Sequence, residues 1–322
     1  MAQKTNPSAA TRRQVIAAAP LPVPRTELVN VLEYEAQARL ALGARAAPIL
    51  GSDRSVTDRI TLRPRMNIPT RDLDLTGSLF GDAHFAPIIV GPISDQKRFH
   101  PEGEVAMARG ASEAKAAIVI SADASMPLDK IAQAATAPLY LQVHAGDPGV
   151  RDRLAQAPNA KAVFVTVEDA IEWAAIDAVM KATSLPLVVK GITTPQQARQ
   201  AIAHGATGIV ISNWHHGSSA TQPGTLLLIE PVLQAVGGKV PVLVDGSFRR
   251  GTDIIKALAF GAKAVLIGRP VMWGLAAYGA DGVQGVMEML QTELARYMCM
   301  CGRPNLAAVD SSLVRVHGVQ HG

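Results

Sequence analysis

The chain has 322 residues, of which 48% are hydrophobic, 4% aromatic and 18% charged. This composition is typical of close-packed helices on a buried parallel sheet, as in soluble α/β enzymes. The formal charge of +4 comes from scattered Lys and Arg with no basic run interleaved with aromatic residues, which argues against a nucleic-acid partner. A basic surface is also suited to attracting anionic substrates or a phosphate-bearing cofactor.

Cysteine content and hydropathy exclude further classes. The two cysteines, Cys299 and Cys301, form neither a disulfide framework nor a four-ligand zinc set, so we predict no metal site. No run of 18 apolar residues is present, so no membrane span is predicted. We expect a cytoplasmic protein.

The N-terminal segment, residues 1–25, is predicted to be a flexible tail. Residues 11–16 (TRRQVI) loosely resemble a twin-arginine export signal. The apolar stretch that follows is short and is broken by Pro20, Pro22 and Pro24. Export is therefore the lesser alternative, and residues 26–322 are predicted to form one domain.

Residues 27–42 have the pattern of an amphipathic helix, which we expect to cover the bottom of the following domain. Beyond it, short apolar runs alternate with stretches of helical periodicity. Runs of this kind, apolar on both faces, predict strands of a parallel sheet. They lie at residues 87–91, 117–121, 139–143, 162–166, 186–190, 208–212, 241–245 and 264–268. Eight strand–helix units predict a (β/α)8 TIM barrel, with an open doubly wound sheet as the alternative.

Nearly every predicted strand ends on a polar residue. A single Ser or Thr there is most often a helix cap, but polar groups at the ends of parallel strands converge on one mouth. Together they indicate a ligand site. The residues are Ser94, Ser121, Gln142, Thr166, Lys190, Ser212, Asp245 and, at the last strand, Gly268.

Lys190 is the most informative of these residues because it ends an apolar run, and buried lysines are rare unless they are paired. A cation there suits the edge of a flavin that becomes negative on reduction. Two other interpretations remain open. Lys190 forms a Schiff base, or it pairs with a nearby carboxylate such as Glu168.

The last two predicted strands are followed by a glycine- and arginine-rich cluster. Residues 245–251 read DGSFRRG and residues 268–270 read GRP. In barrels, the loops after strands seven and eight commonly hold phosphate, because glycines expose backbone N–H groups and arginines complete the site. Arg249 and Arg269 are the expected phosphate ligands, while Arg250 also fits a solvated loop.

These motifs resemble the FMN-dependent α-hydroxy acid oxidase and dehydrogenase family over residues 26–310. The resemblance rests on LRPR (62–65), GPI (91–93), HPEGE (100–104), LVVKG (187–191), ISN (211–213), DGS (245–247), RRGTD (249–253) and IGRP (267–270). It implies an FMN cofactor, a small-molecule substrate and a homo-oligomer, in this family often a tetramer. It places the FMN contacts on Pro92, Ile93, Ser94, Ser121, Gln142, Thr166, Lys190, Ser212, Asp245, Gly246, Ser247, Arg249, Gly268 and Arg269.

The substrate side departs from the family pattern. The family's catalytic histidine directly follows the Ser-Asn pair, and this position is Trp214. The substrate-binding arginine expected three residues later is Gly217. The family's tyrosine after the glutamine is His144, its aspartate after Thr-Val is Glu168, and the long loop after the fourth strand is missing. The mouth is therefore expected to be more open, and oxidation of ordinary 2-hydroxy acids is doubtful.

Two functions fit this pattern. The first is an FMN-dependent oxidoreductase acting on a CH–OH group with altered substrate scope, in which His144, Glu168, His215 or His216 carries out the acid–base step. Glu168 fits that role if it is unpaired and partly buried. The second is a non-catalytic FMN-binding protein. A phosphate-binding barrel lyase or isomerase that uses Lys190 is a more distant alternative.

Overall fold

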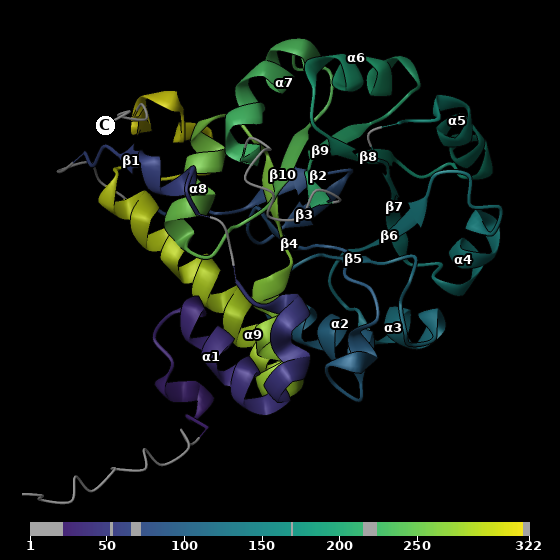
Figure 1. Ribbon diagram of the computed structural model, residues 1–322. Coiled ribbons are helices and arrows are strands. Elements are labelled where there is room, and N and C mark those ends of the chain that lie inside the picture. Colours follow the sequence, from purple (N-terminus) through teal and green to yellow (C-terminus); the bar gives the residue numbers. More distant parts are fainter. Residues whose placement is uncertain (1–21, 52–53, 66–71, 169, 215–223, 318–322) are drawn as a thin grey trace, which may run out of the picture.

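Eight parallel strands close into a barrel in the computed structural model of the chain, which describes residues 22–51, 54–65, 72–168, 170–214 and 224–317 (Figure 1). The closed order β10-β11-β4-β5-β6-β7-β8-β9 confirms the TIM barrel and rules out the open doubly wound sheet. The strands are β4 (Ile88–Val90), β5 (Ile118–Ile120), β6 (Leu139–His144), β7 (Ala160–Thr166), β8 (Leu187–Ile192), β9 (Gly208–Ile211), β10 (Val242–Asp245) and β11 (Ala264–Ile267).

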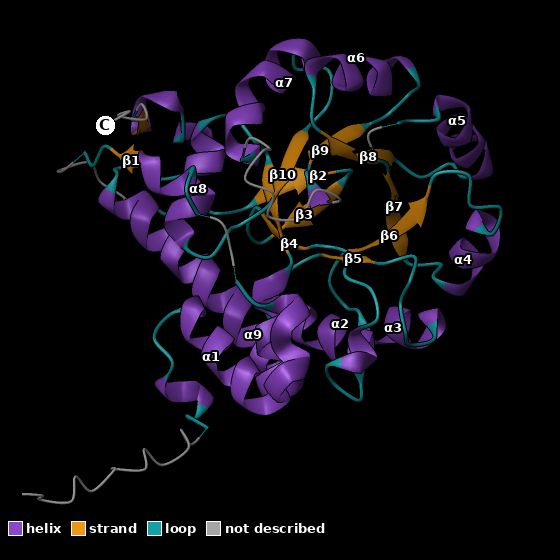
Figure 2. Cartoon of the chain, viewed as in Figure 1, coloured by secondary structure: helices purple, strands orange, loops and turns teal. Residues whose placement is uncertain are grey.

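One helix follows each barrel strand, and together these helices surround the barrel (Figure 2). They are α2 (Gly103–Glu113), α3 (Leu128–Ala134), α4 (Val150–Gln156), α5 (Trp173–Ala182), α6 (Pro195–Ala203), α7 (Ile229–Val236), α8 (Gly251–Ala259) and α9 (Arg269–Met300). In the described residues, no helix is both long and apolar enough to cross a membrane.

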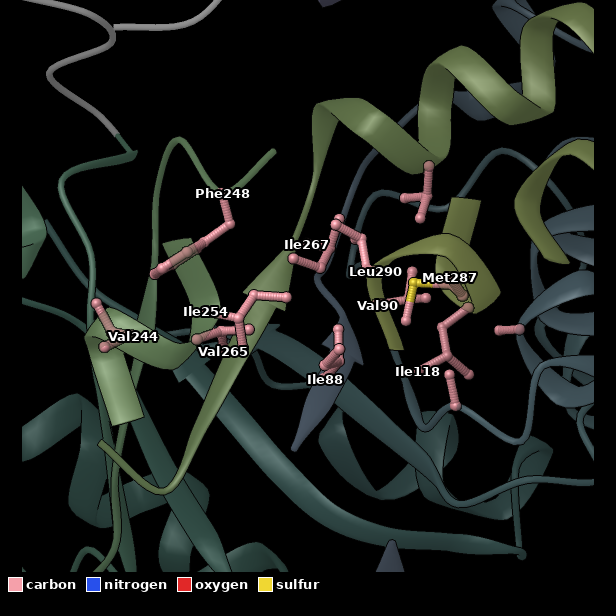
Figure 3. Close-up of a cluster of buried hydrophobic side chains, with 14 of the residues drawn as sticks. Ile88, Val90, Ile118, Val244, Phe248, Ile254, Val265, Ile267, Met287 and Leu290 are labelled. Atoms are coloured by element: carbon pink, nitrogen blue, oxygen red, sulfur yellow. The ribbon is translucent and has the colours of Figure 1, made fainter. Parts of the chain in front are cut away.

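The barrel strands are apolar on both faces because both faces are buried. In β4, Ile88 and Val90 point outward into the large cluster under the helices, whereas Ile89 points into the barrel. Figure 3 shows part of the outer cluster, where Val90 lies near Met287 and Leu290 of α9. The continuous apolar runs in the sequence therefore mark strands covered on two sides.

A short hairpin, β2 (Gly77–Leu79) and β3 (Asp82–His84), fills the bottom of the barrel. The ring of Phe80, at the hairpin tip, lies edge-on to the rings of Tyr140 and Phe164, with centroids 5.8 and 6.0 Å away. The hydroxyl of Tyr140 is 2.8 Å from Nε2 of His84. This end of the barrel is therefore closed by aromatic packing.

The N-terminal helix α1 (Val31–Leu42) does not cover the barrel bottom, so that prediction is wrong. It lies beside α9, where the rings of Tyr34 and Tyr278 meet edge-on at 5.8 Å. The 3-10 turn after it, η2 (Gly43–Ile49), lies instead at the opposite end of the barrel, along the mouth. The apolar face of α1 is thus buried against a helix, because the hairpin already occupies the barrel bottom.

The remaining elements join the two ends of the described chain. β1 (Ile60–Leu62) pairs antiparallel with β12 (Val314–Val316), and short 3-10 turns connect the other segments. Of the predicted tail, residues 1–21 lie outside the described residues. Val23 is held through its amide by the side chain of Gln37 and through its carbonyl by the hydroxyl of Tyr278. The domain boundaries stay a prediction.

A kink in α9 depends on closely packed glycines. Gly279 has the non-helical conformation φ 61°, ψ −140°, and the two halves of α9 then touch through Gly274 and Gly282. A Cβ on Gly282 would overlap the carbonyl oxygen of Gly274 and lie 2.6 Å from its carbonyl carbon.

We expect Gly282→Ala to lower the free energy of unfolding by roughly 1–3 kcal/mol, since backbone cannot move aside as a flexible side chain would. Urea unfolding at a fixed flavin concentration would measure the loss. The control is Gly77→Ala, whose Cβ would meet only Leu306 Cδ1 at 3.6 Å, and which should change stability by less than about 0.5 kcal/mol. Equal stability of the two variants would contradict this account of the kink.

Candidate functional site

An open cavity of about 580 Å³ lies at the C-terminal ends of the barrel strands. The predicted cofactor residues that line it are Pro92, Ile93, Asp245, Gly246, Ser247, Arg249, Gly268 and Arg269. Further predicted residues are buried at neighbouring strand ends: Ser121, Gln142, Thr166, Lys190 and Ser212. Ser94 is exposed on the loop after β4 and does not line the cavity. The fold thus gathers the predicted residues, except Ser94, around one mouth.

A buried ion pair lies at the centre of the mouth. Nζ of Lys190 is 2.8 Å from Oδ2 of Asp245 and donates to Oγ of Ser212 at 2.9 Å. Ser212 in turn donates to Oδ2 of Asp245 at 2.9 Å. Lys190 is only 4% exposed, so it needs such a partner. The partner is Asp245 and not Glu168, which corrects the pairing considered from the sequence.

Gln142 is fixed by two donors that directly follow the neighbouring strand β5. Its Oε1 accepts from the backbone N–H of Ala122 at 2.9 Å and from Oγ of Ser121 at 3.1 Å. With the carbonyl oxygen held in this way, the amide nitrogen of Gln142 remains as the donor for a ligand. Thr166, on the next strand, has a buried Oγ1 without a hydrogen-bond partner in the described chain. Such an atom is costly to bury unless a ligand satisfies it.

The arginine cluster has the properties of an anion site. Arg249 is 2% exposed, and its Nε has no hydrogen-bond partner among the described residues. Burial, together with the nearby positive charge of Arg269, lowers the pKa of Arg249 to about 9. Burial also lowers the pKa of Arg269. A buried and a half-buried cation that repel each other are stabilised by an anion placed between them.

Local backbone geometry opens this cluster to a ligand. Gly246 has φ 110° and Ser247 φ 51°, so the chain turns sharply after β10. A Cβ on Gly268 would meet no atom within 4 Å, which leaves room beside the N-terminus of α9. A helix N-terminus, a buried and a half-buried arginine, and free space suit a phosphate group. These residues therefore fit the phosphate of FMN, and the buried Thr166 hydroxyl and Gln142 amide fit the polar edge of its ring.

An aromatic side chain occupies the position of the family's catalytic histidine. Trp214 lines the cavity and is 46% exposed. Its Nε1 donates to the carbonyl oxygen of Val167 at 3.3 Å, and Nζ of Lys190 lies 5.9 Å from the ring centroid. An indole donates a hydrogen bond but accepts none, so Trp214 cannot take a proton from a substrate.

The other predicted acid–base residues have different surroundings. His215 and His216 lie outside the described residues. His144, at the end of β6, is bonded through Nε2 to Oδ2 of Asp123 at 2.9 Å. Glu168 is exposed, so the partial burial on which its role as a base was conditioned is not present. Only six residues separate β7 from α5, in agreement with the expected short connection on this side of the mouth.

Two parts of the mouth were not predicted from the sequence. The first part is the end of η2, residues 47–49, and the following Leu50, which line the cavity. The carbonyl oxygen of Gly51 accepts from Nη2 of Arg249 at 3.1 Å. Asp123 was also missed. A hydrophobic pattern contains no signal that η2 lies at the mouth. Asp123 could have been identified, because it follows a predicted strand two residues after Ser121.

Comparisons with known proteins identify the family of the chain. Residues 30–168 and 147–316 match the family described as FMN-dependent dehydrogenase. A peroxisomal (S)-2-hydroxy-acid oxidase of Oryza sativa subsp. japonica is 33% identical over 355 residues, covering 90% of this chain and 96% of the relative. Glycolate oxidase of Spinacia oleracea is 31% identical over 353 residues, covering 89% of this chain and 95% of the relative.

The similarity extends to the three-dimensional structure. A crystal structure of mandelate oxidase with (S)-2-phenylpropionate superposes with a TM-score of 0.85 at 30% identity, covering 91% of this chain and all of that one. Fold, sequence family and the arginine cluster at the mouth therefore point to the same family. The chain is a divergent member of the FMN-dependent dehydrogenase family, which includes the 2-hydroxy-acid oxidases, and its cofactor is FMN.

Proposed function

We propose that this protein is an FMN-dependent oxidoreductase that oxidises a CH–OH group and has an altered substrate site. The observation that carries the proposal is the contrast between the two halves of the mouth. The cofactor half has buried, positioned polar groups, among them the Lys190–Asp245 pair and Arg249. The substrate half has Trp214 where the family has its base.

In this proposal each half has a separate task. Bound FMN supplies a two-electron acceptor for hydrogen removed from carbon. Arg249 and Arg269 hold its phosphate, and Lys190 stabilises negative charge at the ring edge. The acid–base step falls to a residue of the substrate half. His144, His215 and His216 are the candidates, and His144 has the best-defined geometry of those that the structure describes. Glu168 is exposed and lacks the partial burial that this role requires.

A non-catalytic FMN-binding protein is the second candidate. Trp214 favours it, because an indole fills the base position and its Nε1 is already bonded to Val167. In that case the cofactor contacts persist while turnover is lost.

Anaerobic flavin reduction separates the two functions. We expect the purified protein to release FMN on denaturation, and the native protein to be bleached by at least one compound in a panel of 2-hydroxy acids, esters, amides and aromatic alcohols. Dithionite serves as the control for a reducible flavin. If dithionite bleaches the flavin and no compound of the panel does, the non-catalytic alternative is favoured.

Three further features belong to this proposal. We expect a homo-oligomer, a small-molecule substrate and no nucleic-acid partner. A cytoplasmic location also stays a prediction. The rice relative is named as a peroxisomal protein, and that location applies to the relative. Size-exclusion chromatography with light scattering would test the oligomer.

A further inference from the structure

His144 and Asp123 form a hydrogen-bonded pair at the rim of the mouth. Nε2 of His144 lies 2.9 Å from Oδ2 of Asp123, and both side chains are more than one third exposed. A carboxylate that accepts from Nε2–H leaves Nδ1 of the ring as the basic nitrogen. Nδ1 has no hydrogen-bond partner among the described residues. It is therefore available to an incoming group.

The pair is held by the network that also fixes Gln142. The N–H of Asp123 donates to Oγ of Ser121 at 3.2 Å, and Ser121 donates to Gln142. The carbonyl oxygen of Asp123 accepts from the N–H of Asp95, on the loop after β4, at 3.2 Å. Residues from the C-terminal ends of β4, β5 and β6 thus meet around Asp123. A positioned carboxylate can fix the imidazole in one tautomer and orientation.

The strand register places this pair on the ligand side of the barrel. Side chains alternate along a strand, so Tyr140, Gln142 and His144 of β6 share one face. Tyr140 lies in the barrel interior and Gln142 at the floor of the mouth, so His144 lies one step further out. His144 is paired in register with Thr166, whose buried Oγ1 has no partner in the described chain. A polar ligand is therefore expected beside His144.

The described rim around this pair is acidic. Asp95, Asp123 and Glu168 are exposed at the ends of β4, β5 and β7. The nearby cations are largely engaged elsewhere. Lys190 is neutralised by Asp245, and Arg153 is bound to Asp147. Lys97 and Arg98, in the turn after Asp95, are the exposed exceptions. An anionic substrate would meet repulsion here, whereas a neutral one would not.

We propose that His144 is the proton acceptor of this enzyme, with Asp123 as its positioning residue, and that the substrate carries no negative charge beside the hydroxyl-bearing carbon. This inference rests on the proposed oxidoreductase function. The O–H bond breaks and its proton passes to Nδ1 of His144. The C–H hydrogen leaves with its bonding electron pair, which FMN accepts, and a C=O double bond forms. Amides or esters of 2-hydroxy acids and aromatic alcohols meet this description.

Binding tests the charge preference without turnover. Benzoylformate and benzoylformamide differ only by a carboxylate and an amide, and neither carries a hydroxyl group to oxidise. Titrated into the oxidised holoenzyme and followed by flavin absorbance, the amide should bind at least about tenfold more tightly. Asp123→Asn should reduce that preference, whereas Asp281→Asn on α9 should not. Asp281 is exposed and has no hydrogen bond or ion pair with a described residue.

Flavin reduction tests the proton acceptor. With mandelamide under anaerobic single-turnover conditions, His144→Ala should slow reduction by roughly 100- to 10,000-fold. Asp123→Asn should slow reduction by mandelamide by about tenfold and should lower the mandelate concentration that gives half the maximal rate of reduction. Asp123→Glu should restore part of the rate. A purely structural role of Asp123 would change both substrates alike. The FMN content of each variant, measured after denaturation, shows whether the site has remained folded.

The outcomes distinguish a failure of the substrate inference from a failure of the proposed oxidoreductase function. If mandelate reduces the flavin faster than mandelamide, and benzoylformate binds more tightly than its amide, the oxidoreductase function stands and the substrate inference is wrong. Parental rates in His144→Ala would show that His144 is not the acceptor. If no probe reduces a flavin that dithionite bleaches, both the proposed function and the proton transfer fail.

Discussion

An Arg249→Met variant is expected to lose FMN during purification. Arg249 is buried, its Nε has no partner in the described chain, and burial beside Arg269 lowers its pKa to about 9. These features make the free site electrostatically costly and the phosphate-bound site favourable. Each charge-assisted hydrogen bond contributes about 1.5–3 kcal/mol. Loss of two such bonds weakens FMN binding by roughly 150- to 20,000-fold.

Fluorescence titration of the apoprotein with FMN would measure this loss. The guanidinium carbon of Arg249 lies over the ring of Trp273, 4.8 Å from its centroid. Methionine removes the charge and leaves an apolar side chain beside this ring. Riboflavin, which lacks the phosphate, should bind equally to both proteins. Arg250→Met is the matched control, because Arg250 is bonded to Glu293 of α9. If Arg249→Met and Arg250→Met affect FMN affinity equally, the phosphate does not bind at Arg249.

A Lys190→Met variant is expected to lower the midpoint potential of the bound flavin. In the proposed site the Lys190 charge would stabilise the anionic reduced ring. Two charges 4 Å apart interact by about 4 kcal/mol at an effective dielectric constant near 20. The ion pair with Asp245 offsets part of this. A net change of roughly 2–4 kcal/mol corresponds to a decrease of about 40–90 mV for a two-electron couple. Spectroelectrochemical titration would measure it.

The double variant Lys190→Met/Asp245→Asn provides the control. In Lys190→Met the negative charge of Asp245 remains and still repels the reduced ring. Removing both charges restores neutrality, so the potential should return toward that of the unmodified protein. Retained FMN with an unchanged potential in Lys190→Met would show that Lys190 does not lie near the reduced ring.

The barrel was predictable because its strands carry local information. Each apolar run in the sequence coincides with an observed strand to within two residues at either end, since burial on both faces requires continuous hydrophobicity. The glycines and arginines after β10 and β11 were also identified, because a phosphate site needs them close together in sequence. Local patterns therefore predicted both the scaffold and the proposed anion site.

Contacts that depend on tertiary packing were not predictable in this way. The tip of the β2–β3 hairpin places Phe80 at φ 55°, a conformation uncommon for an aromatic residue. It is stabilised by the rings of Tyr140 and Phe164, which are distant in sequence. Likewise, nothing within residues 121–125 indicates that Asp123 meets His144. Pairings of this kind become visible only when neighbouring strand ends are brought together.

The aromatic closure of the barrel has a kinetic consequence. Phe80, Tyr140 and Phe164 block passage through the interior, so small molecules reach the flavin only from the opposite end. The electron donor and the electron acceptor must then use the same entrance in turn. An enzyme of this shape is expected to show parallel lines in double-reciprocal plots. Each reactant at high concentration should also inhibit, because it binds to the oxidation state of the enzyme that reacts with the other reactant.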